Sequence, residues 1–254
     1  MQQYVLTLAC PDQPGIVRAL ADAIVEVKGN ILESAQFSDP VTGTFCVRTQ
    51  FETPDQDDHF VRAALAAKVG VFGPVVTLRP LDRKRRVLVM VSNHKDTRAL
   101  VERHGIPFVY LPVAKDAKAQ AEQRLFDLVD EHDIDVVILA RYMQVLSDDA
   151  CRRLSGRIIN IHHSFLPGFK GAKPYHQAYE RGVKLIGATA HYVTADLDEG
   201  PIIEQDVVRV THAQSADTLV AIGRDVERIV LARAVRLHAE DRVVLTGART
   251  VVFA

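Results

Sequence analysis

Hydrophobic residues follow two different periods over residues 1–80. They alternate with polar residues over 4–9, as in a half-buried strand, and recur at helical spacing over 16–27. A turn sequence over 39–43 separates two further strand patterns. The β-α-β-β-α-β order predicts an N-terminal ferredoxin-like domain. We expect its strands over 4–9, 31–37, 44–51 and 75–78, and its helices over 16–27 and 54–68.

Continuous apolar runs replace the alternating ones from residue 87 onward, and helical patterns separate them. Such runs are typical of strands that are buried on both faces of a parallel sheet. The predicted fold class is α/β, with a Rossmann-like, mostly parallel sheet over 87–254 and a linker over 81–86. We expect strands over 87–91, 108–111, 134–140, 157–161, 185–193 and 202–208, helices over 96–103, 118–131, 148–154, 174–181 and about 215–240, and a terminal hairpin over 242–253.

Composition and charge exclude several classes of function. A net charge of −1 argues against bulk nucleic-acid binding, and the basic run over 83–86 is interpreted as a solvated linker. No apolar stretch is long enough to cross a bilayer, and the first residues lack the pattern of a signal peptide. Cys10, Cys46 and Cys151 are odd in number and widely spaced, which favours buried free thiols in a cytoplasmic protein.

Polar residues gather where the strand over 157–161 ends. Asn160 and His162 should emerge on the same side of that strand, and Asp198 lies in an acidic loop that Gly200-Pro201 ends. An amide donor, an imidazole and a carboxylate form a plausible set for attack on a carbonyl carbon. A structural alternative is open as well, in which Asp198 caps loop amides and Asn160 satisfies backbone groups.

Three longer motifs carry a resemblance to a known family. Asn160-Ile161-His162, Ser164-x-Leu166-Pro167 and 197–203 resemble the signature of the 10-formyltetrahydrofolate formyltransferase fold. The runs over 173–182 and 187–192 are more specific and resemble formyltetrahydrofolate deformylases. The resemblance implies that water attacks the formyl carbon of 10-formyltetrahydrofolate, releasing tetrahydrofolate and formate for purine biosynthesis, with no cofactor besides the folate substrate.

The resemblance also assigns roles to individual residues. Asp198 would position and activate the water, and Asn160 and His162 would stabilise the oxyanion. His163 favours a deformylase over an amine-formylating relative, although an exposed loop histidine is the alternative, and His191 either lines the site or packs. The histidines lack a recognised zinc spacing, so no metal is expected. The expected substrate-binding residues are Arg141, Tyr142, Met143, Gln144, Val145, Leu146, His163, Ser164, His191 and Gly200; for Met143 and Leu146, core packing is the alternative.

Residues 10–17 resemble the opening of ACT domains, which sense small ligands, often amino acids, and pair across subunits. This resemblance implies a regulatory or dimerisation domain, a possible amino-acid effector and a homo-oligomer, although Pro14-Gly15 also reads as an ordinary turn. The expected regulatory ligand residues are Asp12, Pro14, Gly15 and Asn30.

The chain departs from the deformylase pattern near residue 91. The family's second domain begins with two strands and a helix between them, whereas here the apolar run over 87–91 continues directly into Ser92-Asn93-His94. About thirty residues, the size of a strand-and-helix unit, are missing. We expect the sheet to form with reduced stability or with a partner subunit over the gap. The alternative functions are an amine formyltransferase and a catalytically weak folate- or amino-acid-binding regulatory protein.

Overall fold

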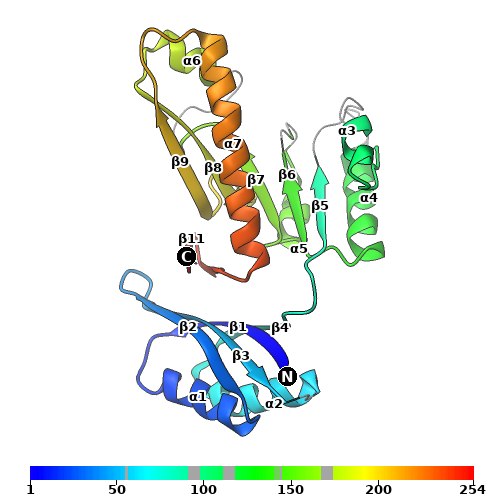
Figure 1. Cartoon of the computed structure of the whole chain (residues 1–254), viewed down its shortest axis with the longest axis vertical. Helices are drawn as coiled ribbons and strands as arrows, with labels where there is room; N and C mark the ends of the chain where they lie inside the picture. The colour runs from blue at the N-terminus through cyan, green and yellow to red at the C-terminus, as the bar shows by residue number, and fades with distance from the viewer. Residues whose placement is uncertain (55–56, 91–97, 111–117, 141, 143–144, 167–173) are drawn as a thin grey trace. The chain divides into compact units, whose positions relative to one another are not determined.

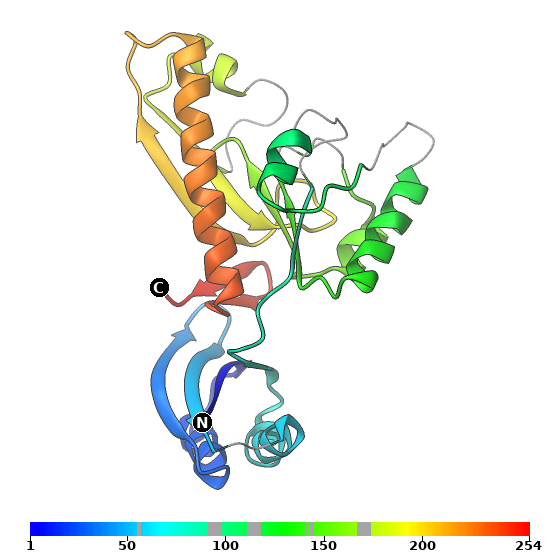
Figure 2. The ribbon, with the colours of Figure 1, turned by 45° about the vertical axis from the view of Figure 1, so that its right-hand side comes forward.

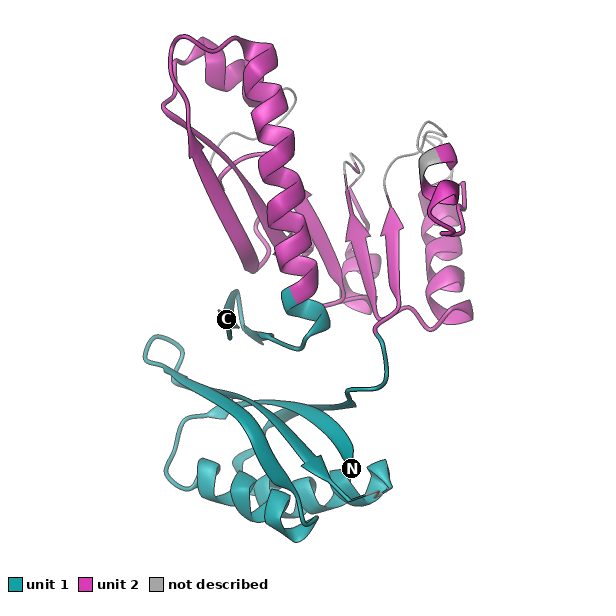
Figure 3. Cartoon of the chain, viewed as in Figure 1, with its two compact units in different colours: residues 1–84, 237–254 teal, residues 85–236 magenta. Residues whose placement is uncertain are grey.

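The computed structural model describes the chain except for residues 55–56, 91–97, 111–117, 141, 143–144 and 167–173 (Figures 1 and 2). Two compact units are present, Met1–Lys84 with Leu237–Ala254, and Arg85–Arg236 (Figure 3). The sequence assigned everything after residue 86 to the second domain, whereas the last eighteen or so residues of the chain fold with the first unit. The first unit is therefore built from both ends of the chain.

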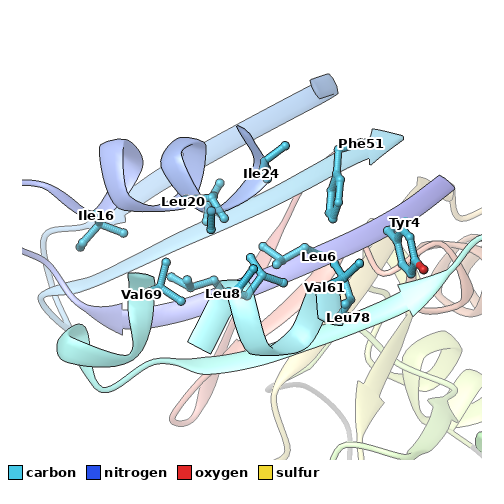
Figure 4. Close-up of a cluster of buried hydrophobic side chains, with 14 of the residues drawn as sticks. Tyr4, Leu6, Leu8, Ile16, Leu20, Ile24, Phe51, Val61, Val69 and Leu78 are labelled. Atoms are coloured by element: carbon cyan, nitrogen blue, oxygen red, sulfur yellow. The ribbon is translucent and has the colours of Figure 1, made fainter. Parts of the chain in front are cut away.

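The first unit has an antiparallel four-stranded sheet in the order β2-β3-β1-β4. Two helices pack their apolar faces on this sheet, because hydrophobic residues recur in them at helical spacing. Tyr4, Leu20 and Phe51 belong to the shared core (Figure 4). The elements are β1 (Gln2–Pro11), α1 (Ile16–Glu26), β2 (Asn30–Asp39), β3 (Thr44–Thr53), α2 (Asp58–Val69), the 3-10 turn η1 (Gly70–Phe72) and β4 (Val75–Pro80).

The C-terminal residues of the first unit form a hairpin of β10 (Val243–Thr246) and β11 (Arg249–Val252). Val244 and Phe253 are buried against Cys46 of β3. Arg79 of β4 pairs with Asp241 at 2.6 Å, and both side chains are almost fully buried. Removing one member of such a buried ion pair costs about 3–5 kcal/mol. The hairpin is thus fixed to the first unit by apolar burial and by this ion pair.

The second unit contains a five-stranded sheet in the order β5-β6-β7-β8-β9 (Figure 1). β5, β6 and β7 are parallel, whereas β8 is antiparallel to both β7 and β9. The prediction of a mostly parallel sheet is wrong in this half. The loop between β8 and β9 is too short for a crossover helix, which makes that pair antiparallel, and β8 also runs antiparallel to β7 although α6 (Pro174–Glu180) lies between them in the chain. The strands are β5 (Val87–Met90), β6 (Val136–Leu139), β7 (Ile158–His162), β8 (Leu185–Tyr192) and β9 (Ile202–Arg209).

Helices cover this sheet and supply most of its core contacts. Leu125 and Val129 pack on β6, all of whose residues are buried. The long helix α7 runs along β8 and β9 in both views (Figures 1 and 2), and Arg233 on it pairs with Asp206 of β9 at 3.0 Å. The helices are α3 (Arg98–Arg103), α4 (Lys118–Glu131), α5 (Asp148–Arg153), α6 (Pro174–Glu180) and α7 (Ala216–Ala239).

The start of the second unit differs from the sequence prediction. Residues 108–110 are not in a strand, and 111 lies outside the described residues. β5 is the last strand at its side of the described sheet, and Val87 and Val89 on it are 41% and 51% exposed. A β-strand requires a neighbour to bond with. Among the described residues, β5 therefore has β6 as its single strand neighbour.

The described part of the chain contains no helix that is both long and apolar enough to cross a membrane. Cys10, Cys46 and Cys151 are free and buried, as the sequence indicated. Burial raises the pKa of the Cys46 thiol to about 11, so this side chain is an uncharged core group at neutral pH.

Candidate active site

Two rows of polar side chains cross the antiparallel part of the second sheet. Asn160 on β7 lies directly opposite His191 on β8. One step further along the same face, His162 lies opposite Thr189, and Thr189 lies opposite Gln205 of β9. Residues two apart on a strand share a face. Because Asn160 and His162 both lie in β7, they emerge on the same side, as predicted.

The loop after β8 carries Asp198 to the end of β7. The His162 Nδ1 atom lies 3.2 Å from the Asp198 Oδ1 atom, and His162 is 5% exposed. A carboxylate at this distance can accept a hydrogen bond from the imidazole and so orient the ring. The structure therefore brings together the amide, imidazole and carboxylate that the sequence singled out in two distant segments.

His191 connects Asn160 to Asp198. Its Nδ1 atom lies 2.9 Å from the Tyr192 carbonyl oxygen, which can only accept a hydrogen bond, so Nδ1 carries the proton. The Nε2 lone pair then accepts from the Asn160 amide nitrogen at 3.3 Å. Burial lowers the pKa of His191, whose Nε2 atom also lies 3.8 Å from the Asp198 Oδ1 atom.

The backbone around Asp198 is shaped by two special positions. Asp198 has a φ of 58°, in the left-handed region that aspartate and asparagine tolerate better than most residues. Gly200 is buried, and a Cβ atom on it would lie 1.8 Å from the Tyr192 carbonyl oxygen. Gly200 is also a predicted substrate-binding residue, and its position allows close contact between the loop and the end of β8.

His163 and Ser164 directly follow β7. Ser164 is buried, and the His163 ring lies edge-on to His162 with centroids 5.0 Å apart. Burial lowers the pKa of His163, and its Nδ1 atom is buried without a hydrogen-bond partner among the described residues. The interpretation of His163 as an exposed loop histidine therefore does not hold.

The predicted folate-binding segment follows β6, which is parallel to β7, so the segment begins at the same sheet edge as Asn160. Leu146 is a buried core residue, and Tyr142 packs partly buried against the same core. Val145 is 51% exposed. These positions match the core-packing alternative for Leu146 and leave Val145 accessible. Arg141, Met143 and Gln144 lie outside the described residues.

The predicted regulatory residues are not brought together. Asp12 accepts a hydrogen bond from Ser38, near the end of β2, whereas Asn30 is the first residue of that strand. Eight strand steps separate the two ends, or about 26 Å. Pro14 lies in the turn before α1, and Gly15 occupies its N-cap position with a φ of 100°. The Pro14-Gly15 pair thus fits its alternative interpretation as a turn.

No group of three or more histidine, cysteine, aspartate or glutamate side chains suited to a metal occurs among the residues that are described. Sequence reasoning missed Thr189 and Gln205 as parts of the polar rows. The alternation of Thr189 with apolar neighbours was visible in the sequence, whereas Gln205 lies between Glu204 and Asp206, and only the strand register shows which residues the two face.

Two buried imidazoles give an expected pH dependence of stability. Burial lowers the pKa of His191 and His163 in the folded chain, whereas an unfolded histidine titrates at about 6.5. Below that pH the unfolded state binds more protons, so the free energy of unfolding is greatest above about pH 6.5 and falls as the pH drops. Thermal unfolding between about pH 8 and pH 5 measures this. His191→Gln should make the fall shallower, and His212→Gln, at an exposed position, should not.

Comparison with known proteins adds the family to this geometry. The formyl transferase family model matches residues 76–235. A formyltetrahydrofolate deformylase of Bacillus subtilis (strain 168) is 45% identical over 278 aligned positions, with 98% of this chain and 93% of that protein covered. The chain belongs to the formyltetrahydrofolate deformylase family. The family prediction from the sequence motifs is therefore confirmed.

Solved structures separate the deformylases from the formyltransferases. The deformylase of Burkholderia mallei ATCC 23344 superposes with a TM-score of 0.94 at 44% identity, and the match covers 100% of both chains. A phosphoribosylglycinamide formyltransferase of Anaplasma phagocytophilum gives 0.62 at 30% identity and covers 68% of this chain and 96% of that one. Of these two matches, the deformylase match is the one that covers the whole of this chain.

The alignment with the B. subtilis deformylase is longer than this chain, 278 positions against 254 residues. That relative therefore has residues with no counterpart in this chain.

Proposed function

We propose that this protein hydrolyses 10-formyltetrahydrofolate to formate and tetrahydrofolate. The observation that supports this most is the 3.2 Å contact between His162 and Asp198 beside Asn160, in a chain of the deformylase family. The substrate is inferred from the relatives, which are named formyltetrahydrofolate deformylases. The formate released would serve purine biosynthesis and help to balance the one-carbon folate pools.

The side chains support a water attack on the formyl carbon. Asp198 holds the water and draws a proton from it as the oxygen bonds to carbon. One Asn160 amide hydrogen is directed to His191, which leaves the other free to bind the oxyanion together with His162. The bond from the formyl carbon to N10 then breaks, N10 takes up a proton, and formate and tetrahydrofolate leave.

Formate release from 10-formyltetrahydrofolate by the purified chain tests the proposal. We expect steady turnover without any added amine. Formate and tetrahydrofolate should appear in equal amounts, since each hydrolysis yields one of both. Folate binding without turnover would reject hydrolysis in favour of a regulatory binding protein, and tetrahydrofolate formation that requires an amine would reject it in favour of a transferase.

The first unit is proposed to be an ACT-type regulatory and dimerisation domain in a homo-oligomer. Its β-α-β-β-α-β order and its antiparallel sheet order support this. Repeating the formate assay with amino acids tests for an effector. We further propose that the reaction needs no metal or other cofactor and takes place in the cytoplasm, where the three free thiols stay reduced.

A further inference from the structure

Thr189 holds the backbone that follows His162. Its side chain is fully buried, and its hydroxyl donates to the Ser164 carbonyl oxygen at 3.0 Å. The same hydroxyl accepts from the Leu166 backbone nitrogen at 3.1 Å and from the Gln205 amide at 2.9 Å. A threonine hydroxyl offers one donor and two acceptor sites, so every site of this hydroxyl is used.

Gln205 is equally committed. Its amide nitrogen donates to the Leu166 carbonyl oxygen at 3.2 Å as well as to Thr189, which uses both amide hydrogens. Both backbone groups of Leu166 and the carbonyl of Ser164 are thus bonded to two side chains from neighbouring strands. We call Thr189 and Gln205 the β8–β9 clamp.

The clamp acts on the segment that leaves β7 immediately after His162. Thr189 is the cross-strand neighbour of His162, and the bonded groups lie two and four residues further along the chain. The β7–β8 ladder therefore holds the backbone at His162 itself, and the clamp holds the backbone that follows it. A loop without such bonds would let the imidazole move relative to Asp198.

We infer that Thr189 and Gln205 are positioning residues for His162, which keep its imidazole in register with Asp198 during the reaction. This inference rests on the proposed hydrolysis, since its readout is formate release. Neither residue contacts the catalytic carboxylate, so the effect passes through the Ser164–Leu166 backbone. Misplacing a reacting group by about 1 Å costs about a hundredfold in rate.

Thr189→Val tests the clamp, because valine keeps the shape and removes the hydroxyl. We expect kcat to fall about tenfold to a hundredfold, with KM changing less than about threefold. Thr189→Ser restores the hydroxyl and should recover most of kcat. Gln205→Met, which removes both amide donors, should lower kcat in the same way.

A matched control separates positioning from general stability. Thr53 in the first unit is as fully buried as Thr189, and its hydroxyl bonds the Pro54 carbonyl oxygen at 2.5 Å. Thr53→Val should lower the melting temperature by a similar amount and leave kcat unchanged. If Thr189→Val matches this control in kcat while the wild-type chain releases formate, the inference is wrong. If the wild-type chain itself releases none, the proposed function fails instead.

Discussion

Asp198→Asn should lower formate release by about three orders of magnitude and leave the fold intact. Asparagine has the same shape and tolerates the left-handed φ of 58° at this position, so the loop keeps its path. The substitution removes the negative charge 3.2 Å from the His162 ring and with it the group that accepts a proton from water. Steady-state formate release, together with the thermal unfolding midpoint, measures both parts of the expectation.

Asp196→Asn is the matched control for that experiment. Asp196 is an exposed aspartate in the same loop, and its backbone carbonyl accepts from the Thr194 hydroxyl and the Glu199 backbone nitrogen. We expect wild-type turnover from it. Near-wild-type turnover from Asp198→Asn would instead exclude a carboxylate-dependent attack and return Asp198 to a purely structural role.

Gly200→Ala should be the most damaging small substitution in the site. The added Cβ would lie 1.8 Å from the Tyr192 carbonyl oxygen and 3.2 Å from the His191 Nδ1 atom, which bond to each other. Because the obstacle is backbone, the loop or the end of β8 has to move, at a cost of about 2–4 kcal/mol. The melting temperature and kcat should fall together, since the same movement displaces Asp198 and disturbs His191.

Gly70→Ala is the corresponding control in the first unit. A Cβ atom on Gly70 meets nothing within 4 Å, and its φ of −56° suits any residue. That variant should unfold and turn over like the wild type. Equal behaviour of the two alanine variants would mean that the contact between Gly200 and Tyr192 is not needed for the fold or for the reaction.

The hydrophobic pattern predicted nearly every helix and strand, because an element buried on one face shows a periodic pattern and a strand buried on both faces, such as β6, shows a continuous apolar run. The helix over 118–131 has the predicted ends. The strand that carries Asn160 and His162 begins and ends within one residue of its predicted bounds. The strand over 108–111 was wrong for a physical reason, since an apolar run cannot show whether a neighbouring strand exists. Strand direction also failed: the buried runs of β6 and β8 look alike, and one is parallel to β7 while the other is antiparallel.

The candidate site was likewise predicted only in part from the sequence. Residue chemistry and resemblance identified Asn160, His162 and Asp198, and the geometry brings His162 and Asp198 into contact. The parts that escaped prediction depend on three-dimensional register. Nothing in the sequence shows that His191 faces Asn160, that Thr189 faces Gln205, or that Gly200 touches the Tyr192 carbonyl.

The pairing of Arg79 with Asp241 sets the order in which this chain can complete its folding. During synthesis Arg79 is made long before Asp241, Val244 and Phe253. The N-terminal part of the first unit is therefore made before the residues that cover Cys46. Until those residues are made, the N-terminal segment has Cys46 uncovered and Arg79 without its carboxylate partner. A fragment that stops at residue 84 would keep that unfinished state permanently.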